Sequence, residues 1–170
     1  PKSDVAVLLL SFILTVVFDL VVAISVGLGL ACLMFMKRMA DVSHIKEWEY
    51  VEITDDEDGR LKPVPAHVMV YEITGPMFFG SADKIPNIDN REGTKRVLVL
   101  RMRSVPAIDA TAMNGFTRLV KQCEKANVQV IFSHVNEQPM REFHHSGLFE
   151  MVGEEFFQPN IDAALEKANT

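Results

Sequence analysis

An almost unbroken run of apolar positions occupies residues 5–36, where Asp19 is the only charged side chain. As one helix, this run would be about 48 Å long at 1.5 Å per residue, whereas the hydrocarbon core of a bilayer is about 30 Å thick. A single spanning helix would also place Asp19 near the bilayer centre, which costs at least ~2.5 kcal/mol on insertion scales. The length and the buried acid both disfavour a single span.

Two short helices, over residues 5–17 and 20–36, account for the run better. Asp4 and Asp19 are predicted to cap them, because a carboxylate accepts hydrogen bonds from the unpaired N–H groups of a first turn. We therefore expect residues 1–39 to form a membrane hairpin with Asp19 at its turn. The alternatives are a single tilted span with a partner-paired Asp19, and a buried helix of a soluble core.

Basic residues close the apolar run, since Lys37 and Arg38 follow it directly. Such residues favour the cytoplasmic side of a membrane, so the chain from about residue 40 onward is predicted to be cytoplasmic. Residues 40–47 would continue the second helix as a linker with little Gly or Pro, which predicts mechanical coupling between the hairpin and the charged remainder of the chain. The chain starts at Pro1 without a Met, and we expect it to be the end of a longer protein.

Residues 48–170 change to the patterns of a water-soluble α/β domain. Alternating positions predict strands over residues 47–53 and 67–73, which are expected to pair as a hairpin. Nearly continuous apolar runs at residues 95–102 and 128–133 are typical of strands that are buried on both faces.

Helical spacing of apolar positions predicts helices over residues 109–127, 137–147 and 160–169. Because strands alternate with these helices, we expect a mixed, partly parallel sheet with flanking helices. Phe78 and Phe79 are expected to fill its core. The acidic residues 55–58 are predicted to form a solvated loop, since they lack the oxygen spacing of a calcium loop, and a short helix is expected near Ser81.

Sites in such sheets form at the carboxyl ends of the strands, which singles out the sequence RSVPAIDAT at residues 103–111. Asp109 follows a buried strand and opens a helix. The backbone N–H groups of residues 110–113 are predicted to point into this loop, where they can hold an anion. The alternative is that Asp109 simply caps the helix. Thr111 is a candidate for phosphorylation, because phosphate is favoured at a helix start.

Charge and composition exclude several classes of function. The net charge of −6 argues against a nucleic-acid partner. Cys32 and Cys123 lie in different parts of the chain and suggest no disulfide framework, which fits a reducing compartment. His144 and His145 diverge by about 100° on a helix and, with His134, are expected to be structural or surface residues. No catalytic residue, metal or cofactor is predicted, because no catalytic triad, phosphate loop or close carboxylate pair stands out.

Four segments resemble one protein family. SDVAVLLLSFILTVVFDLVVAISVGLGLACLMFMKRM is similar to the last two membrane helices of SulP-family anion transporters, the sulfate permeases. VYEITGPMFFGSAD, VLVLRMRSVPAIDATAMNGF and HHSGLFEMVGEEFFQPNIDAALEKA resemble the STAS domain that follows those helices. The resemblance covers nearly the whole chain, and its segments occur in the order that the family has.

This resemblance implies an α/β STAS-like fold behind a short transmembrane helical hairpin. It also implies a secondary-active transporter of sulfate, bicarbonate or dicarboxylate type in the inner membrane. Its partners would be the rest of the transporter domain and a second copy, and its cytoplasmic STAS domain would serve regulation, assembly, or the binding of a regulatory protein or nucleotide. The substrate would lie among earlier membrane helices, so no residue here is assigned to it. The other hypotheses are a membrane-tethered STAS signalling module and a membrane-anchored enzyme.

Soluble relatives of the STAS domain, the anti-sigma-factor antagonists, are switched at an Asp followed by a phosphorylatable Ser and then Ser or Thr. Asp109 and Thr111 match that pattern, but the phosphoacceptor position is Ala110, which has no hydroxyl group. The resemblance therefore does not carry the phosphorylation switch over to this chain. It implies that residues 109–111 form a regulatory or ligand-binding loop.

Overall fold

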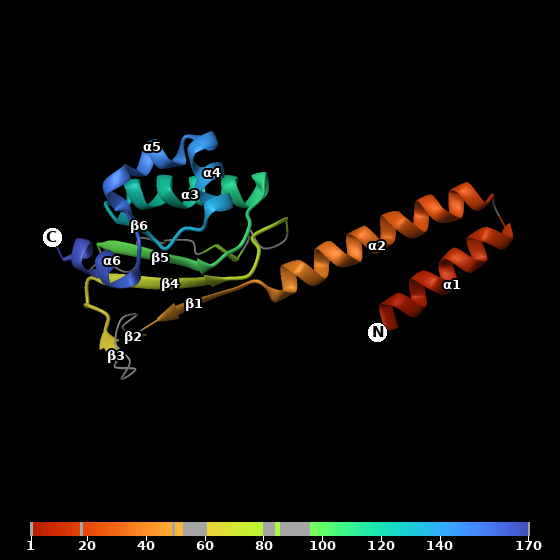
Figure 1. Ribbon diagram of the computed structural model, residues 1–170, viewed down its shortest axis with the longest axis horizontal. Coiled ribbons are helices and arrows are strands. Elements are labelled where there is room, and N and C mark those ends of the chain that lie inside the picture. Colours follow the sequence, from red (N-terminus) through yellow and green to blue (C-terminus); the bar gives the residue numbers. More distant parts are fainter. Residues whose placement is uncertain are drawn as a thin grey trace.

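The structure, a computed structural model, describes residues 2–17, 19–48, 50–52, 61–79, 84–85 and 96–169. The chain forms a helical hairpin and an α/β domain, and the second helix of the hairpin leads directly into the first strand of the domain (Figure 1). The predictions for the acidic residues 55–58 and for a helix near Ser81 fall outside the described residues.

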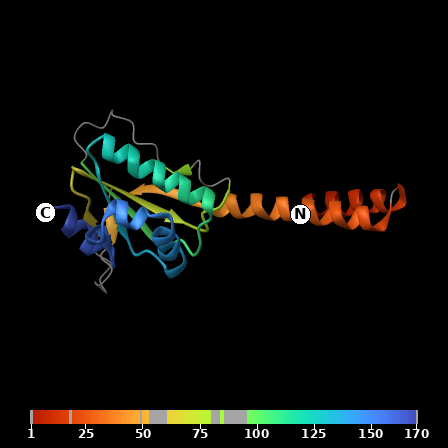
Figure 2. The same ribbon diagram turned by 90° about the horizontal axis from the view of Figure 1, so that it is seen from above.

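The hairpin consists of α1 (Lys2–Val17) and α2 (Leu20–Val42), which lie side by side in both views of the chain (Figures 1 and 2). Most of their large apolar side chains are exposed, as in helices that face lipid or other membrane helices. A Cβ atom on Gly27 would lie 2.7 Å from Ser11 Oγ, so this glycine lets the two helices approach closely. Within the described residues, Leu20–Met39 forms the one helix that is long and apolar enough to cross a membrane.

The domain is built on a five-stranded mixed sheet with the order β1-β4-β5-β6-β7. Strand β1 runs antiparallel to β4, and all other neighbours are parallel. Strands β2 and β3 form a separate antiparallel pair. The bounds are β1 His44–Trp48, β2 Tyr50–Glu52, β3 Leu61–Pro63, β4 Val68–Thr74, β5 Val97–Ser104, β6 Gln129–Ser133 and β7 Phe157–Gln158.

The first strand differs from the sequence prediction. We expected the second helix to continue through residue 47 and a strand to begin there, but α2 ends at Val42 and β1 begins at His44. Pairing with β4 sets this start, because β1 lies in register with β4 from His44 opposite Thr74 to Trp48 opposite Val70. Of the strand predicted over residues 47–53, Glu47 and Trp48 pair antiparallel with residues 70–71 as expected. Tyr50–Glu52 pairs with Leu61–Pro63 instead, so the predicted hairpin with residues 67–73 is wrong in this part.

Helices cover the two faces of the sheet unequally. Three of them, α3, α4 and α5, pack over a core with Phe116, Phe132 and Phe143 at its centre, and α6 covers the other face. This arrangement confirms the predicted α/β fold with a mixed sheet and flanking helices. The helix bounds are α3 Ala110–Lys125, α4 Glu137–Ser146, α5 Leu148–Val152, the 3-10 helix η2 Glu154–Phe156 and α6 Ile161–Ala168.

The carboxyl end of the parallel strands faces the hairpin. Because β1 leaves α2 directly and runs antiparallel to β4, His44 at the hairpin end of β1 lies opposite Thr74 at the carboxyl end of β4. The strands β5 and β6 run parallel to β4, and the arrowheads of β4 and β5 point toward α2 (Figure 1). The predicted regulatory loop therefore lies at the edge of the sheet that is nearest α2 (Figure 1).

Candidate functional site

Two loops at this edge extend the sheet by a short additional pairing. Met77, after β4, donates its N–H to the carbonyl group of Ala107, after β5, at 2.9 Å. Asp109 donates its N–H to the carbonyl group of Met77 at 3.1 Å, and Met77 and Ile108 form an isolated parallel bridge. Met77 and Ile108 are buried. These contacts fix the position from which α3 begins.

The carboxylate group of Asp109 joins the same two loops. Its Oδ1 accepts a hydrogen bond from the N–H of Ala112 at 2.8 Å, which caps α3, so the capping interpretation of Asp109 is confirmed. Its Oδ2 accepts from the N–H of Phe79 at 2.9 Å. One side chain thus fixes both the first turn of α3 and the loop after β4.

This cap reduces the number of backbone N–H groups that are left for the anion site predicted from the sequence. The N–H of Ala112 is bound by Asp109 Oδ1, and the N–H of Met113 donates to the carbonyl group of Asp109 at 2.9 Å. Of the four N–H groups expected to face a ligand, those of Ala110 and Thr111 are left for it. Both residues have exposed side chains at the edge that faces the hairpin.

Phe79 corrects a sequence prediction. We expected Phe78 and Phe79 to fill the core, but the side chain of Phe79 is 69% exposed, while that of Phe78 is half-buried. Phe79 lies in a turn that follows the bridge at Met77, where its backbone bends away from the core. The contact between the Phe79 N–H and Asp109 holds this aromatic side chain at the surface beside the start of α3.

The amino end of α4 supports the loop after β5. Asn136 Nδ2 donates to the carbonyl groups of Val105 at 2.7 Å and Arg103 at 3.0 Å. The side-chain amide of Gln138 accepts from the N–H of Ile108 at 2.9 Å and donates to its carbonyl group at 3.1 Å. Neither residue is predicted as part of the site from the sequence. An Asn just before a predicted helix was the one available signal, and it indicates a cap instead.

The end of α2 is attached to the same edge. Ser43, which follows α2, is fully buried, and its Oγ donates a hydrogen bond to the carbonyl group of Pro76. Lys84 Nζ donates to the carbonyl group of Ser43 at 2.8 Å. The N–H of Gly75 in turn donates to the carbonyl group of Ser104 at the end of β5. The hairpin is therefore joined to the loops that carry Asp109.

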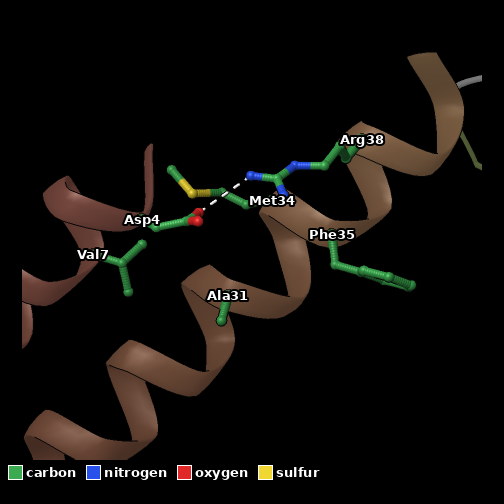
Figure 3. Close-up of a pocket in the computed structure, with 6 residues that line it drawn as sticks. All are labelled: Asp4, Val7, Ala31, Met34, Phe35 and Arg38. Atoms are coloured by element: carbon green, nitrogen blue, oxygen red, sulfur yellow. Dashed lines mark hydrogen bonds and ion pairs between the residues drawn. The ribbon is translucent and has the colours of Figure 1, made fainter. Parts of the chain in front are cut away.

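The hairpin carries two further acids from the sequence analysis. Asp4 was expected to precede the first helix as its cap, but α1 begins at Lys2, and Asp4 lies within its first turn. Its carboxylate forms an ion pair of 3.2 Å with Arg38 across the hairpin (Figure 3). Asp19 lies between α1 and α2 with an exposed side chain, and its carbonyl group accepts from the N–H of Ala23 at 3.1 Å.

The ion pair borders a small cavity at the open end of the hairpin. Its volume is about 230 Å³, and apolar side chains from both helices form most of its wall (Figure 3). The lining residues are Asp4, Val7, Ala31, Met34, Phe35 and Arg38. Because both partners of the pair are more than half exposed, the attraction between them contributes little to stability in water.

The remaining reactive side chains are dispersed. Burial raises the pKa of the Cys123 thiol to about 11, which makes it a poor nucleophile, and Cys32 lies exposed on α2. His134 and His145 are exposed, and His144 stands 3.8 Å from Glu150. In the part of the chain that the structure describes, no three His, Cys, Asp or Glu side chains are grouped as metal ligands would be.

Comparison with known proteins assigns the family. Residues 61–168 match the STAS domain family. A Bacillus subtilis protein named as a candidate sulfate transporter, YvdB, is 28% identical over 163 residues, which are 95% of this chain and 30% of that protein. The crystal structure of a sulfate transporter family protein from Wolinella succinogenes is 37% identical and has a TM-score of 0.61. The match covers 69% of this chain and 96% of that one.

A third match extends over the hairpin as well as the domain. The structure of the murine anion transporter Slc26a9 in its inward-facing state matches 99% of this chain and 29% of its own, with a TM-score of 0.72 and 20% identity, so it concerns the fold alone. This chain thus spans about three tenths of the length of these transporters. The matched domain and the identity to sulfate transporter proteins lead to one assignment. The chain belongs to the STAS domain family, and its STAS domain is that of a SulP (SLC26) transporter.

Proposed function

We propose that this chain is the membrane-anchored regulatory end of a secondary-active anion transporter. The relatives named above are a candidate sulfate transporter and an anion transporter, which supports an inorganic anion as the substrate class. The observation that carries the proposal is the direct passage from α2 into β1, with Val42 as the last helical residue and His44 as the first strand residue. A domain attached so closely follows any movement of the last membrane helix.

The proposed arrangement places the hairpin in the inner membrane and the STAS domain in the cytoplasm. Lys37 and Arg38 at the domain end of α2 support this orientation, because basic residues are retained on the cytoplasmic side. Residues 1–39 would complete the transporter's membrane domain. The last residues of α2 and Ser43 would connect it to the STAS domain, which would begin at His44, the first residue of β1. A homodimer of the whole transporter is part of the proposal.

The proposed regulatory route runs from the Asp109 loop to α2. Asp109 contacts Met77 through its N–H, Pro76 precedes Met77, and the Pro76 carbonyl group is bound by Ser43. A regulatory protein or nucleotide that meets Asp109, Ala110 and Thr111 would displace loops that contact the end of α2 directly. The loop would then have two positions, one with and one without the regulator. A regulator that binds one of these positions more tightly would shift the transporter toward the state that has this position.

Anion uptake tests the proposal. Cells that express the complete gene should accumulate radiolabelled sulfate or bicarbonate, and removal of residues 48–170 should change the uptake rate about threefold or more if the domain regulates transport. Membrane insertion of the truncated protein, measured by fractionation, is the control. A complete protein that reaches the membrane and moves neither anion, nor a small dicarboxylate, would contradict the proposal.

A further inference from the structure

Phe79 is an unusual side chain for the surface of the domain. Among the described residues outside the hairpin, large apolar side chains are markedly exposed at two positions, Phe79 with 69% and Met151 with 44%. Phe79 lies at the edge that faces the hairpin, and Asp109 holds its backbone. Met151 lies at the opposite edge, beside Gln129 and Val130 at the start of β6.

We propose that Phe79 inserts into the headgroup layer of the same bilayer that holds the hairpin. The edge of the domain would then rest on the membrane through Phe79 and would be attached to it through α2. The inference depends on the proposed function in one respect, since it requires the hairpin to lie in the bilayer.

Distances along the chain bring Phe79 within reach of the lipid headgroups. The apolar run of α2 ends at Met36, and Ser43 follows seven residues later, about 10 Å along a helix. The headgroup layer is about 5 to 8 Å thick on each side of the hydrocarbon core. Ser43 therefore lies about 2 to 5 Å outside this layer. The Pro76 carbonyl group bonds to Ser43, and Phe79 is three residues beyond Pro76, within about 10 Å along an extended chain.

The chemistry of this edge suits a zwitterionic lipid surface. An aromatic ring prefers the interface between headgroups and acyl chains. Among the described residues near this edge, positive charge is carried by Lys37, Arg38, Lys84 and Arg103 and negative charge by Asp41, Asp109 and Glu137. The two signs are nearly balanced, so these residues do not select anionic lipid. A soluble partner is disfavoured as the occupant, because the ring lies on the side of the domain from which α2 arrives.

Fluorescence quenching by brominated lipid tests the inference on the intact chain. Trp48 is the single tryptophan, so Trp48→Phe combined with Phe79→Trp gives a reporter at this position alone. In phosphatidylcholine nanodiscs, its emission should fall about twofold when bromine is placed near the headgroup end of the acyl chains, and less when bromine is near the methyl end. The matched control is Trp48→Phe with Met151→Trp, which is also exposed and should keep its emission in both lipids.

A third reporter separates this inference from the proposed function. Phe12 on α1 is 65% exposed, and Trp48→Phe with Phe12→Trp should be quenched strongly if the hairpin is embedded. Loss of that quenching would contradict the membrane assignment itself. Quenching at position 12 without quenching at position 79 would overturn the inference alone. Acrylamide would then reveal either a solvent-exposed ring or one covered by protein, and both results reject lipid contact.

Discussion

The hydroxyl group of Ser43, at the end of α2, donates a hydrogen bond to the carbonyl group of Pro76, in the loop after β4. The Met39 carbonyl group lies 3.3 Å from the same oxygen, and Lys84 Nζ donates to the Ser43 carbonyl group at 2.8 Å. A buried serine thus joins α2 to the sheet edge that carries Asp109. The domain is therefore attached to the hairpin by side-chain contacts as well as by the continuous chain.

Replacement of Ser43 should weaken this attachment. Ser43→Ala leaves the Pro76 carbonyl group without its donor, and we expect the free energy of unfolding to fall by about 1 to 2 kcal/mol. Urea unfolding of the intact chain in detergent, followed by Trp48 fluorescence, measures this change. The control is Ser104→Ala, whose side chain is exposed and which should change stability by less than about 0.5 kcal/mol. Equal stability of the two variants would show that the Ser43 contact is unimportant.

Asp109 should contribute to stability through both of its oxygen atoms. Asp109→Ala removes the cap of α3 and the acceptor for Phe79, and we expect a loss of about 2 kcal/mol. Thr111→Ala is the matched change in the same loop, because its side chain is exposed, and it should be nearly neutral. Urea midpoints of the two variants that coincide would contradict the double role of this carboxylate.

The stability of the domain should depend on the charge of the side chain at position 136 as well as on its size. Asn136 Nδ2 donates to carbonyl groups of Arg103 and Val105, so Asn136→Asp would set a carboxylate against these oxygens. We expect Asn136→Asp to cost about 2 kcal/mol or more and Asn136→Ala about 1 kcal/mol. Thermal unfolding of both variants measures this order, and an aspartate variant as stable as the wild type would refute the hydrogen-bond assignment.

The fold could be predicted largely because its strongest signals are local. The apolar runs of β5 and β6 and the helical spacing of α3 depend on burial of each segment alone. The first strand was misplaced because Ile45 and Trp48 are three residues apart, which also fits one face of a helix. Pairing with β4 decides between the two structures. Strand β7 has two residues and offers no periodicity to detect.

The candidate site was predictable only in part for the same reason. A cap joins residues three positions apart, so the role of Asp109 in α3 can be inferred from its place before the helix. Its second contact, with Phe79, spans 30 residues, as does the contact of Gln138 with Ile108. Contacts at such separations are set by how the loops pack. For this reason, the exposure of Phe79 has no signal in the sequence, and the place of Asn136 before a helix indicates only a cap.

Cys123 is expected to make the domain less stable at alkaline pH. Burial raises the thiol pKa from 9.0 to about 11, so the folded state holds the proton more tightly than the unfolded chain does. This contribution to stability is complete below pH 9.0 and is lost as the pH rises through about 11. We expect the unfolding free energy to fall by about 2 kcal/mol more for the wild type than for Cys123→Ala over this interval. Parallel pH profiles of the two proteins would exclude the thiol as the cause.

Insertion of a flexible Gly/Ser segment next to Asp41 tests the direct coupling of hairpin and domain most sharply. It interrupts the end of α2 just before Ser43 while leaving every element of the domain intact. The same segment inserted among residues 55–58, predicted to be a solvated loop, is the control. In cells that express the complete gene, we predict that the insertion at Asp41 changes the rate of anion uptake or its regulation severalfold while the control does not. Identical uptake kinetics and regulation in both variants, with both domains folded, would contradict direct coupling.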